Sequence, residues 1–334
     1  MLEEDLVNER WRSGGFEGKE SCKECNNENV WDLERQCCQR QCHEKLNALQ
    51  ASPHAAWDDI SAAPLDPVKV VAARKLEIKY ADQKPVWKKI LRSVAKAKGW
   101  KIVKSRWIDI NKGDDKNPNY RSRMVGKEFN DSVVDGLFAA TPPLEALRLL
   151  LSWAATLPGA PLGTGERKRG SSKSILIADV SRAFFEAPAK RDLCVELPEE
   201  ALEGEETTTN TVGKLLASLY GTRDASANWQ EEVIKCMREW GFEVSRFNTC
   251  MFQHKTREIR CLVHGDDFVS VGHPDELRWM KTKLSQRFEI KTSMVGMNTH
   301  DGEIKEARIL NRVIRVTPQG WEYEADQRHA DLII

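Results

Sequence analysis

Three aspartates in this sequence stand where strands are expected to end. Asp179 closes a short apolar run, and Asp266 and Asp267 lie in a Gly-Asp-Asp turn between the β-rich segments 259–263 and 268–271. The run predicts a buried strand and the turn predicts a hairpin. Side by side, these elements would bring three mutually repelling carboxylates to one end of a sheet, where divalent cations relieve the repulsion. Two Mg²⁺ ions about 3.5–4 Å apart are the apparatus of in-line phosphoryl transfer, and ordinary turn chemistry is the alternative.

The elements that must position these carboxylates alternate between helix and strand. Residues 66–80 predict a helix, and 101–110 and 120–129 predict two strands that pair across a turn-rich loop. A further helix is expected after Thr141, which is placed to cap it, with two prolines in the first turn. The loop 158–172 has Ser where a phosphate-binding loop needs Lys, so it is expected to be a connector.

The composition is that of a globular protein with room for two or three domains. The chain has 334 residues, of which 40% are hydrophobic and 31% charged. No run approaches the roughly 18 apolar residues of a membrane span, and the acidic N-terminus lacks the apolar segment of a secretory signal. Nine cysteines without such a signal predict reduced thiols and a cytoplasmic or nuclear location, with no membrane partner.

The formal net charge of zero conceals an uneven distribution. Residues 51–110 hold thirteen Lys and Arg against six Asp and Glu, whereas residues 191–210 hold seven acids against the single Arg191. Neutrality as a whole argues against a nucleic-acid partner, but the basic N-terminal third suits a phosphate backbone. A solvated helix face is the alternative explanation for the basic segment.

Five cysteines crowd the first fifty residues. Four of them could supply soft ligands for a tetrahedral zinc ion, namely Cys22, Cys25, Cys38 and Cys42. Their spacing matches no common zinc finger, so a polar leader whose thiols do nothing together is the alternative. A zinc-dependent interaction module is therefore one reading of residues 1–54.

Six motifs, in order along about residues 55–334, resemble the reverse transcriptase of copia-type LTR-retrotransposon Pol polyproteins. They are 121–129 (similar to KARLVAKGF), 179–185 with 195–198, 218–229 (similar to SLYGLKQAP-x-x-W), 241–252, 264–267 (in the place of YVDD), and 288–291 with 309–314. The departures from these patterns include His264 for Tyr, Gly265 for Val or Met, Asp224 for Gln, Ser226 for Pro and Asn311 for Gly.

The resemblance implies an α+β fold of the right-hand polymerase type. Its palm would be an antiparallel sheet backed by helices, joined to fingers and to the start of a thumb or connection. The implied division is a Cys-rich extension over 1–54, a fingers-side region with the leading palm helix over 55–173, a palm over 174–300 and a primer-grip or thumb start over 301–334. A fingers insertion would fall at about 190–215 within the palm.

The resemblance also implies roles for particular residues. The metal ligands would be Asp179, Asp266, Asp267 and the backbone carbonyl of Val180. Arg121 and Arg123 would neutralise the triphosphate. Phe184 would be the steric gate that rejects a 2′-hydroxyl, with ordinary core packing as the alternative. Tyr220 and Gly221 would line the pocket beside the nascent base pair.

Lys291 would be a candidate general acid toward pyrophosphate, or else an exposed lysine at a helix end. The implied activity is two-metal extension of a primer 3′-hydroxyl with dNTPs on an RNA or DNA template, with Mg²⁺ or Mn²⁺. A viral RNA-dependent RNA polymerase and a decayed or domesticated relic that only binds nucleic acid are the alternatives. No ribonuclease H or integrase signature is found in these residues, so those polyprotein segments are expected to be absent from the chain.

Overall fold

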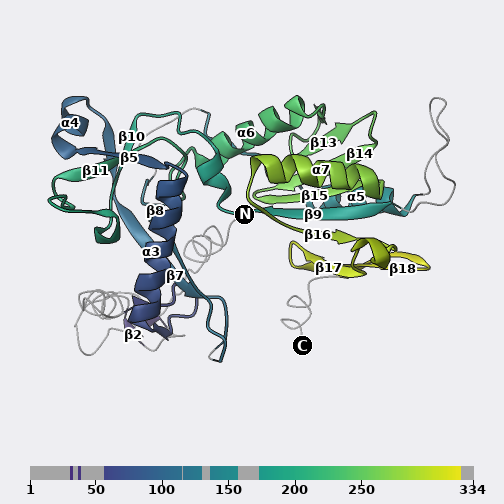
Figure 1. Cartoon of the computed structure of the whole chain (residues 1–334), viewed down its shortest axis with the longest axis horizontal. Coiled ribbons are helices and arrows are strands. Elements are labelled where there is room, and N and C mark those ends of the chain that lie inside the picture. The colour runs from purple at the N-terminus through teal and green to yellow at the C-terminus, as the bar shows by residue number, and fades with distance from the viewer. Residues whose placement is uncertain are drawn as a thin grey trace.

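The computed structural model describes residues 56–114, 116–129, 136–156 and 173–324, together with the backbone of two short strands, β1 (Trp31–Asp32) and β2 (Cys37–Cys38). The side chains of Cys22, Cys25, Cys38 and Cys42, and the loop 158–172, lie outside this description. Figure 1 shows the described chain as two lobes side by side, with helices and strands in both. The mixture of helix and sheet confirms the predicted α+β class.

The N-terminal lobe, on the left of Figure 1, is built around a four-stranded sheet of order β5-β11-β10-β6. Its strands are β5 (Trp87–Leu91), β6 (Lys101–Val103), β10 (Leu193–Glu196) and β11 (Thr211–Leu215). The last two come from much later in the chain than the first two, so residues 193–215 return to this lobe. The smaller elements are β3 (Ala56–Trp57), β4 (Pro64–Leu65), α4 (Arg92–Ala97) and the 3-10 turn η2 (Glu199–Ala201).

The long helix α3 (Pro67–Gln83) packs against the hairpin of β7 (Ser105–Asn111) and β8 (Tyr120–Gly126). The carboxylate of Asp66 accepts the amides of Val68 and Lys69, and Pro67 occupies the first turn. The predicted pairing across the 112–119 loop is confirmed, with Ser105 opposite Gly126.

The C-terminal lobe is organised by a six-stranded antiparallel sheet of order β12-β13-β14-β15-β9-β16. Its strands are β9 (Ser174–Val180), β12 (Glu243–Val244), β13 (Met251–His254), β14 (Ile259–His264), β15 (Asp267–Gly272) and β16 (Ile290–Val295). The 3-10 turn η1 (Ala183–Glu186) follows β9, and η3 (Thr299–Asp301) follows β16.

Helices cover both faces of this sheet. One core joins it to α6 (Ala225–Glu239) and α7 (Pro274–Arg287). The other core joins it to α5 (Leu144–Ala155) and to the small sheet of β17 (Glu306–Ile309), β18 (Arg312–Thr317) and β19 (Gly320–Glu324). Side chains alternate along a strand, so Leu176 and Ala178 of β9 meet α6 and α7 while Ile175 meets α5. Asp179 therefore lies on the α5 face.

Two local predictions are wrong. The segment 101–110 is two strands, because β6 pairs in parallel with β10 while β7 pairs with β8. Thr141 does not cap α5, whose N-cap is Pro143 in an extended conformation without a side-chain hydrogen bond. A residue that precedes proline is pushed out of the helical region, so two successive prolines delay the start of the helix to Leu144.

Among the helices that the structure describes, none has the length and the apolar character that a membrane span requires.

Candidate functional site

The three aspartates meet at one end of the central sheet. Strand β9 pairs with β15 so that Asp179 lies opposite Asp267. The amide of Val180 donates to the carbonyl of Asp266 at 3.0 Å, which closes the turn onto the end of β9. Directly opposed residues in an antiparallel pair have Cβ atoms about 4.5–5.5 Å apart on the same face. The expected convergence of the two elements is confirmed.

Two more polar side chains lie in register with these aspartates, one on each neighbouring strand. His264 of β14 lies opposite Asp267, and Lys291 of β16 lies opposite Asp179. Four side chains able to bind ions or move protons thus stand in line across β14, β15, β9 and β16, on the face that α5 partly covers. Lys291 is exposed and lies within a strand, so its expected placement at a helix end is wrong. Helix α7 ends at Arg287, and Phe288 is already extended.

The carboxylates raise one another's proton affinity. Burial, followed by the charges of Asp266 and Asp179, raises the pKa of Asp267 to about 6. Burial and the charge of Asp179 raise the pKa of Asp266, although Arg123 opposes this. Burial lowers the pKa of His264. Clustered oxygen donors under mutual repulsion fit a hard divalent cation.

The metal-binding arrangement itself is not formed. Within the described ranges, no three His, Cys, Asp or Glu side chains are gathered as a group that could hold a metal ion. The backbone register nevertheless brings the three aspartates to one end of the sheet.

Two arginines of β8 approach this end of the sheet from the N-terminal lobe. Arg121 and Arg123 are two residues apart and therefore share a face of the strand. The guanidinium of Arg123 lies 4.8 Å from the ring centroid of Tyr220. Its Nε atom and the Tyr220 hydroxyl are buried and have no hydrogen-bond partner. Burial raises the pKa of Tyr220 to about 12, so the hydroxyl stays protonated as a donor. Burial, followed by the charge of Arg123, lowers the pKa of Arg121.

A cavity of about 360 Å³ lies between these groups and the Gly265–Asp266 turn. Its lining includes Arg123, Phe184, Tyr220, Trp229, His264 and Asp266. The ring of Phe184 lies 4.7 Å from that of Tyr220, whereas Phe185 is 4% exposed and belongs to the core of the N-terminal lobe. Of these two phenylalanines, only Phe184 lines the cavity, and its role as a steric gate stays a prediction.

Gly221 marks a close approach of two backbones. Its φ is +75°, and a Cβ at this position would stand 2.0 Å from the carbonyl oxygen of Gly126. The amide of Gly126 donates to the carbonyl of Tyr220 at 2.7 Å. The end of β8 is therefore held against the Tyr220–Gly221 segment, which requires glycine there.

Glu77 is a buried group near the site that the sequence analysis did not single out. It lies on α3, is 2% exposed, and accepts a 2.6 Å hydrogen bond from Nε of Arg182. Arg182 lies just after β9 and has a φ of 50°, a strained conformation for a residue other than glycine. The position of Glu77 among the buried Val70, Ile78 and Ala81 is a signal that was available, because a charge on an apolar helical stripe needs a partner.

Comparison with known proteins shows which family this sequence resembles. Residues 88–300 match the family model described as reverse transcriptase (RNA-dependent DNA polymerase). The chain is 27% identical over 198 residues to a retrovirus-related Pol polyprotein from transposon RE1 of Arabidopsis thaliana, a match that covers 57% of this chain and 12% of that polyprotein. It is also similar to the structure of apo telomerase from Candida tropicalis truncated from the C-terminal domain, with a TM-score of 0.45, 11% identity, and coverage of 83% of this chain and 65% of that one.

The motifs noted in the sequence lie within the matched residues, apart from the segment 309–314 that follows them. The predicted likeness to the reverse transcriptase region of a copia-type Pol polyprotein is confirmed. The chain belongs to the reverse transcriptase (RNA-dependent DNA polymerase) family.

Proposed function

We propose that this chain is an RNA-directed DNA polymerase that extends a primer 3′-hydroxyl with dNTPs on an RNA or DNA template and releases pyrophosphate. The observation that carries the proposal is the register that sets Asp267 opposite Asp179, with Asp266 in the turn just before Asp267 and in the lining of the cavity. Family membership makes nucleotidyl transfer the chemistry for such a site.

Asp179, Asp266 and Asp267, with the backbone carbonyl of Val180, would hold two divalent cations, Mg²⁺ or Mn²⁺. When bound, such ions supply a more acidic 3′-hydroxyl and charge stabilisation for the leaving pyrophosphate. The raised pKa of Asp267 supports this assignment, because a cation between these carboxylates removes the repulsion that raises it.

The remaining groups would orient the nucleotide. Arg121 and Arg123 offer planar donors to the triphosphate, and the free Nε of Arg123 is one donor without a partner in this structure. The ring of Phe184 would lie beneath the sugar, and the Tyr220–Gly221 backbone would contact the nascent base pair. Lys291, which lies opposite Asp179 in the sheet, would donate a proton to the pyrophosphate. With little covalent chemistry asked of side chains, positioning carries most of the rate.

In the right-hand description, the N-terminal lobe would be the fingers and the six-stranded sheet the palm. Segments 55–173 and about 190–215 would contribute to the fingers, 174–300 to the palm, and 301–334 to the start of a thumb. The zinc site proposed for Cys22, Cys25, Cys38 and Cys42 stays a prediction, which the metal content of the purified protein tests.

Primer extension on a primed RNA template tests the proposal. We expect product with dNTPs and Mg²⁺, none with EDTA, and much less with rNTPs. Preference for rNTPs would instead indicate an RNA polymerase. Tight binding of the primed template without extension would identify a protein that keeps the fold and has lost the activity.

A further inference from the structure

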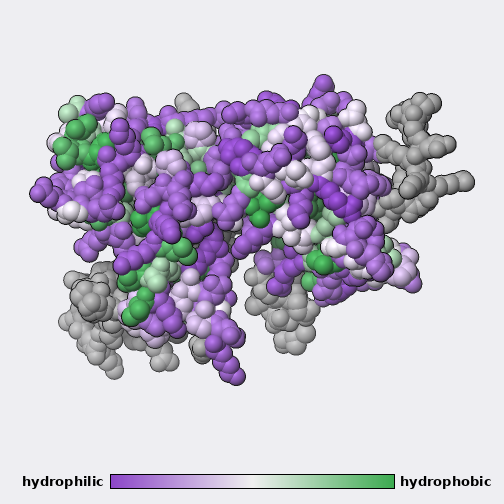
Figure 2. Space-filling view, viewed as in Figure 1, coloured by the Kyte–Doolittle hydropathy of each residue, from purple (hydrophilic) through white to green (hydrophobic). Residues whose placement is uncertain are grey.

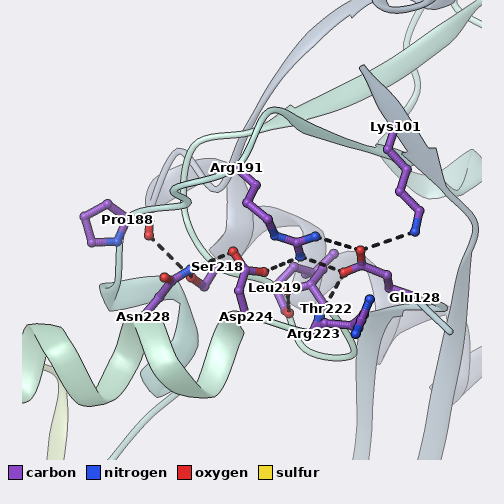
Figure 3. Close-up of polar contacts among 10 residues, drawn as sticks. All are labelled: Lys101, Glu128, Pro188, Arg191, Ser218, Leu219, Thr222, Arg223, Asp224 and Asn228. Carbon is purple, nitrogen blue, oxygen red and sulfur yellow. Dashed lines mark hydrogen bonds and ion pairs between the residues drawn. The ribbon is translucent and has the colours of Figure 1, made fainter. Parts of the chain in front are cut away.

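Arg191 is held between two carboxylates that come from different parts of the chain (Figure 3). Its Nη1 and Nη2 atoms donate to the two oxygens of Glu128 at 2.8 and 2.7 Å, and Nη2 also donates to Oδ1 of Asp224 at 2.6 Å. The side chain of Glu128 is 0% exposed and that of Asp224 is 12% exposed. We call Glu128, Arg191 and Asp224 the Arg191 clamp.

The clamp is anchored on every side. Glu128 lies 3.5 Å from the ammonium of Lys101 on β6 and accepts the amide of Arg223 at 2.9 Å. Asp224, the N-cap of α6, accepts a 3.0 Å hydrogen bond from Asn228, whose amide also donates to Ser218 at 3.1 Å.

Both carboxylates of the clamp are buried and are held in their ionised form. Desolvation alone would raise the pKa of Glu128 and of Asp224, yet both pKa values are lowered. The hydrogen bonds and charge of Arg191 outweigh desolvation, together with Arg223 and Lys101 at Glu128 and with Asn228 at Asp224. Asp224 stands where the resembled motif has Gln, and Glu128 stands where it has Gly. Two carboxylates absent from the motif thus meet on one arginine, and removing the arginine would leave both buried without their partner.

The clamp lies on the path between the arginines of β8 and the catalytic turn. On one side, the amide of Glu128 donates to the carbonyl of Gly221 at 3.2 Å, just beyond the end of β8. On the other side, Asp224 begins α6, and Nε1 of Trp229 on that helix donates to the carbonyl of Gly265 at 2.8 Å. The strand that carries Arg121 and Arg123 is therefore tied to the helix that holds the aspartate turn.

We propose that Glu128, Arg191 and Asp224 are positioning residues that set the distance between the β8 arginines and the catalytic aspartates, and so set the affinity for the incoming nucleotide. The proposal rests on the proposed polymerase function. None of the three residues lines the cavity, so they act through the segments that they join.

Hydrogen exchange of the free protein tests the clamp without any need for activity. In Arg191→Met we expect at least about tenfold faster exchange of amides in 120–128 and 216–224, because a buried ion pair has lost one partner. Amides of β9 and β15 should be unchanged. Lys190→Met is the matched control, because Lys190 pairs with Glu231 on the same helix α6 but the two side chains are 51% and 64% exposed.

Steady-state kinetics tests the proposed effect of the Arg191 clamp on the affinity for the incoming nucleotide. Arg191→Met should raise KM for dNTP about tenfold and change kcat less than about threefold, because positioning acts on nucleotide binding. Lys190→Met should change neither. Arg191→Lys, which keeps the charge but loses the planar fork, should fall between wild type and Arg191→Met and serves if the latter does not fold.

Unchanged exchange in 120–128 and 216–224 would overturn the clamp. Faster exchange with a normal KM and a lowered kcat would overturn its role in nucleotide affinity. A wild-type protein without polymerase activity would refute the proposed function, while the exchange comparison would still decide whether the clamp joins the two segments.

Discussion

Replacing Gly221 by alanine should destabilise the protein far more than the same change at Gly204. Both glycines have a positive φ, +75° and +59°, and an alanine pays about 1 kcal/mol for that conformation at either site. Nothing lies within 4 Å of a Cβ at Gly204, whereas a Cβ at Gly221 would stand 2.0 Å from the carbonyl oxygen of Gly126. The steric clash of an added Cβ therefore adds a further destabilisation at Gly221 that is absent at Gly204.

Relief of that contact requires the end of β8 to move away from the 220–221 segment. The movement breaks the hydrogen bonds from the amides of Gly126 and Glu128, at 2.7 and 3.2 Å. Each is worth about 1 kcal/mol, so Gly221→Ala should cost about 3 kcal/mol in total. An unfolding entropy of about 2.1 cal/mol/K per residue over 334 residues gives about 1.4 °C per kcal/mol. Calorimetry should therefore find Tm lowered by about 4 °C for Gly221→Ala and by about 1.4 °C for Gly204→Ala. Equal decreases would show that β8 does not press on Gly221.

Three further outcomes follow from the site. Phe184→Val should raise incorporation of rNTPs relative to dNTPs, while Phe185→Val should lower Tm and leave that ratio unchanged, because only Phe184 lines the cavity; equal effects on the ratio would refute the gate. The folded-state pKa of Asp267 lies above its usual 3.8, at about 6, so ionisation destabilises the metal-free fold as pH rises through that window. Asp267→Asn in EDTA should therefore have a higher Tm than wild type at about pH 8, with the difference gone below about pH 4; no difference at the higher pH would argue against the repulsion. Saturating Mg²⁺ should raise Tm of the wild type at about pH 8 and not that of Asp267→Asn, since an ion that binds only the folded state stabilises it.

The parts of the fold that could be predicted are those specified by local pattern. The apolar run before Asp179 and the Gly-Asp-Asp turn each indicate a strand end, and their pairing follows once both are strands. Gly265, at a φ of +60°, suits the tight turn. Asn311, where the motif has Gly, has a φ of 62°, a conformation that asparagine tolerates better than most residues.

The missed features depend on contacts between distant segments. Glu128, Arg191 and Asp224 are separated by 63 and 33 positions, and no local period relates them. Strands β6 and β7 are separate because they pair with different strands. β6 pairs with the distant β10, whereas β7 pairs with its neighbour β8. Such pairings depend on tertiary structure, which hydrophobic period and turn chemistry do not specify.

The N-terminal lobe neutralises part of the basic excess of residues 51–110 with its own acidic side chains. Figure 2 shows hydrophilic side chains over most of the visible face, with apolar groups gathered over α4 and α3. Several basic residues of 51–110 are engaged with acids of the 191–210 segment, among them Lys89 with Glu206 and Arg92 with Glu196. Part of the basic excess is therefore neutralised within the lobe, and the salt dependence of template binding should be weaker than the count of Lys and Arg suggests.

Single-turnover primer extension by the wild type and by Asp266→Asn tests the central claim most directly. The two proteins should have the same fold by calorimetry and should be compared on one primed RNA template with dNTPs and Mg²⁺. Loss of a carboxylate that holds the ions removes several kcal/mol of transition-state stabilisation, so extension should slow by about a thousandfold. Equal rates in the two proteins would contradict the assignment of the aspartate turn as the catalytic centre.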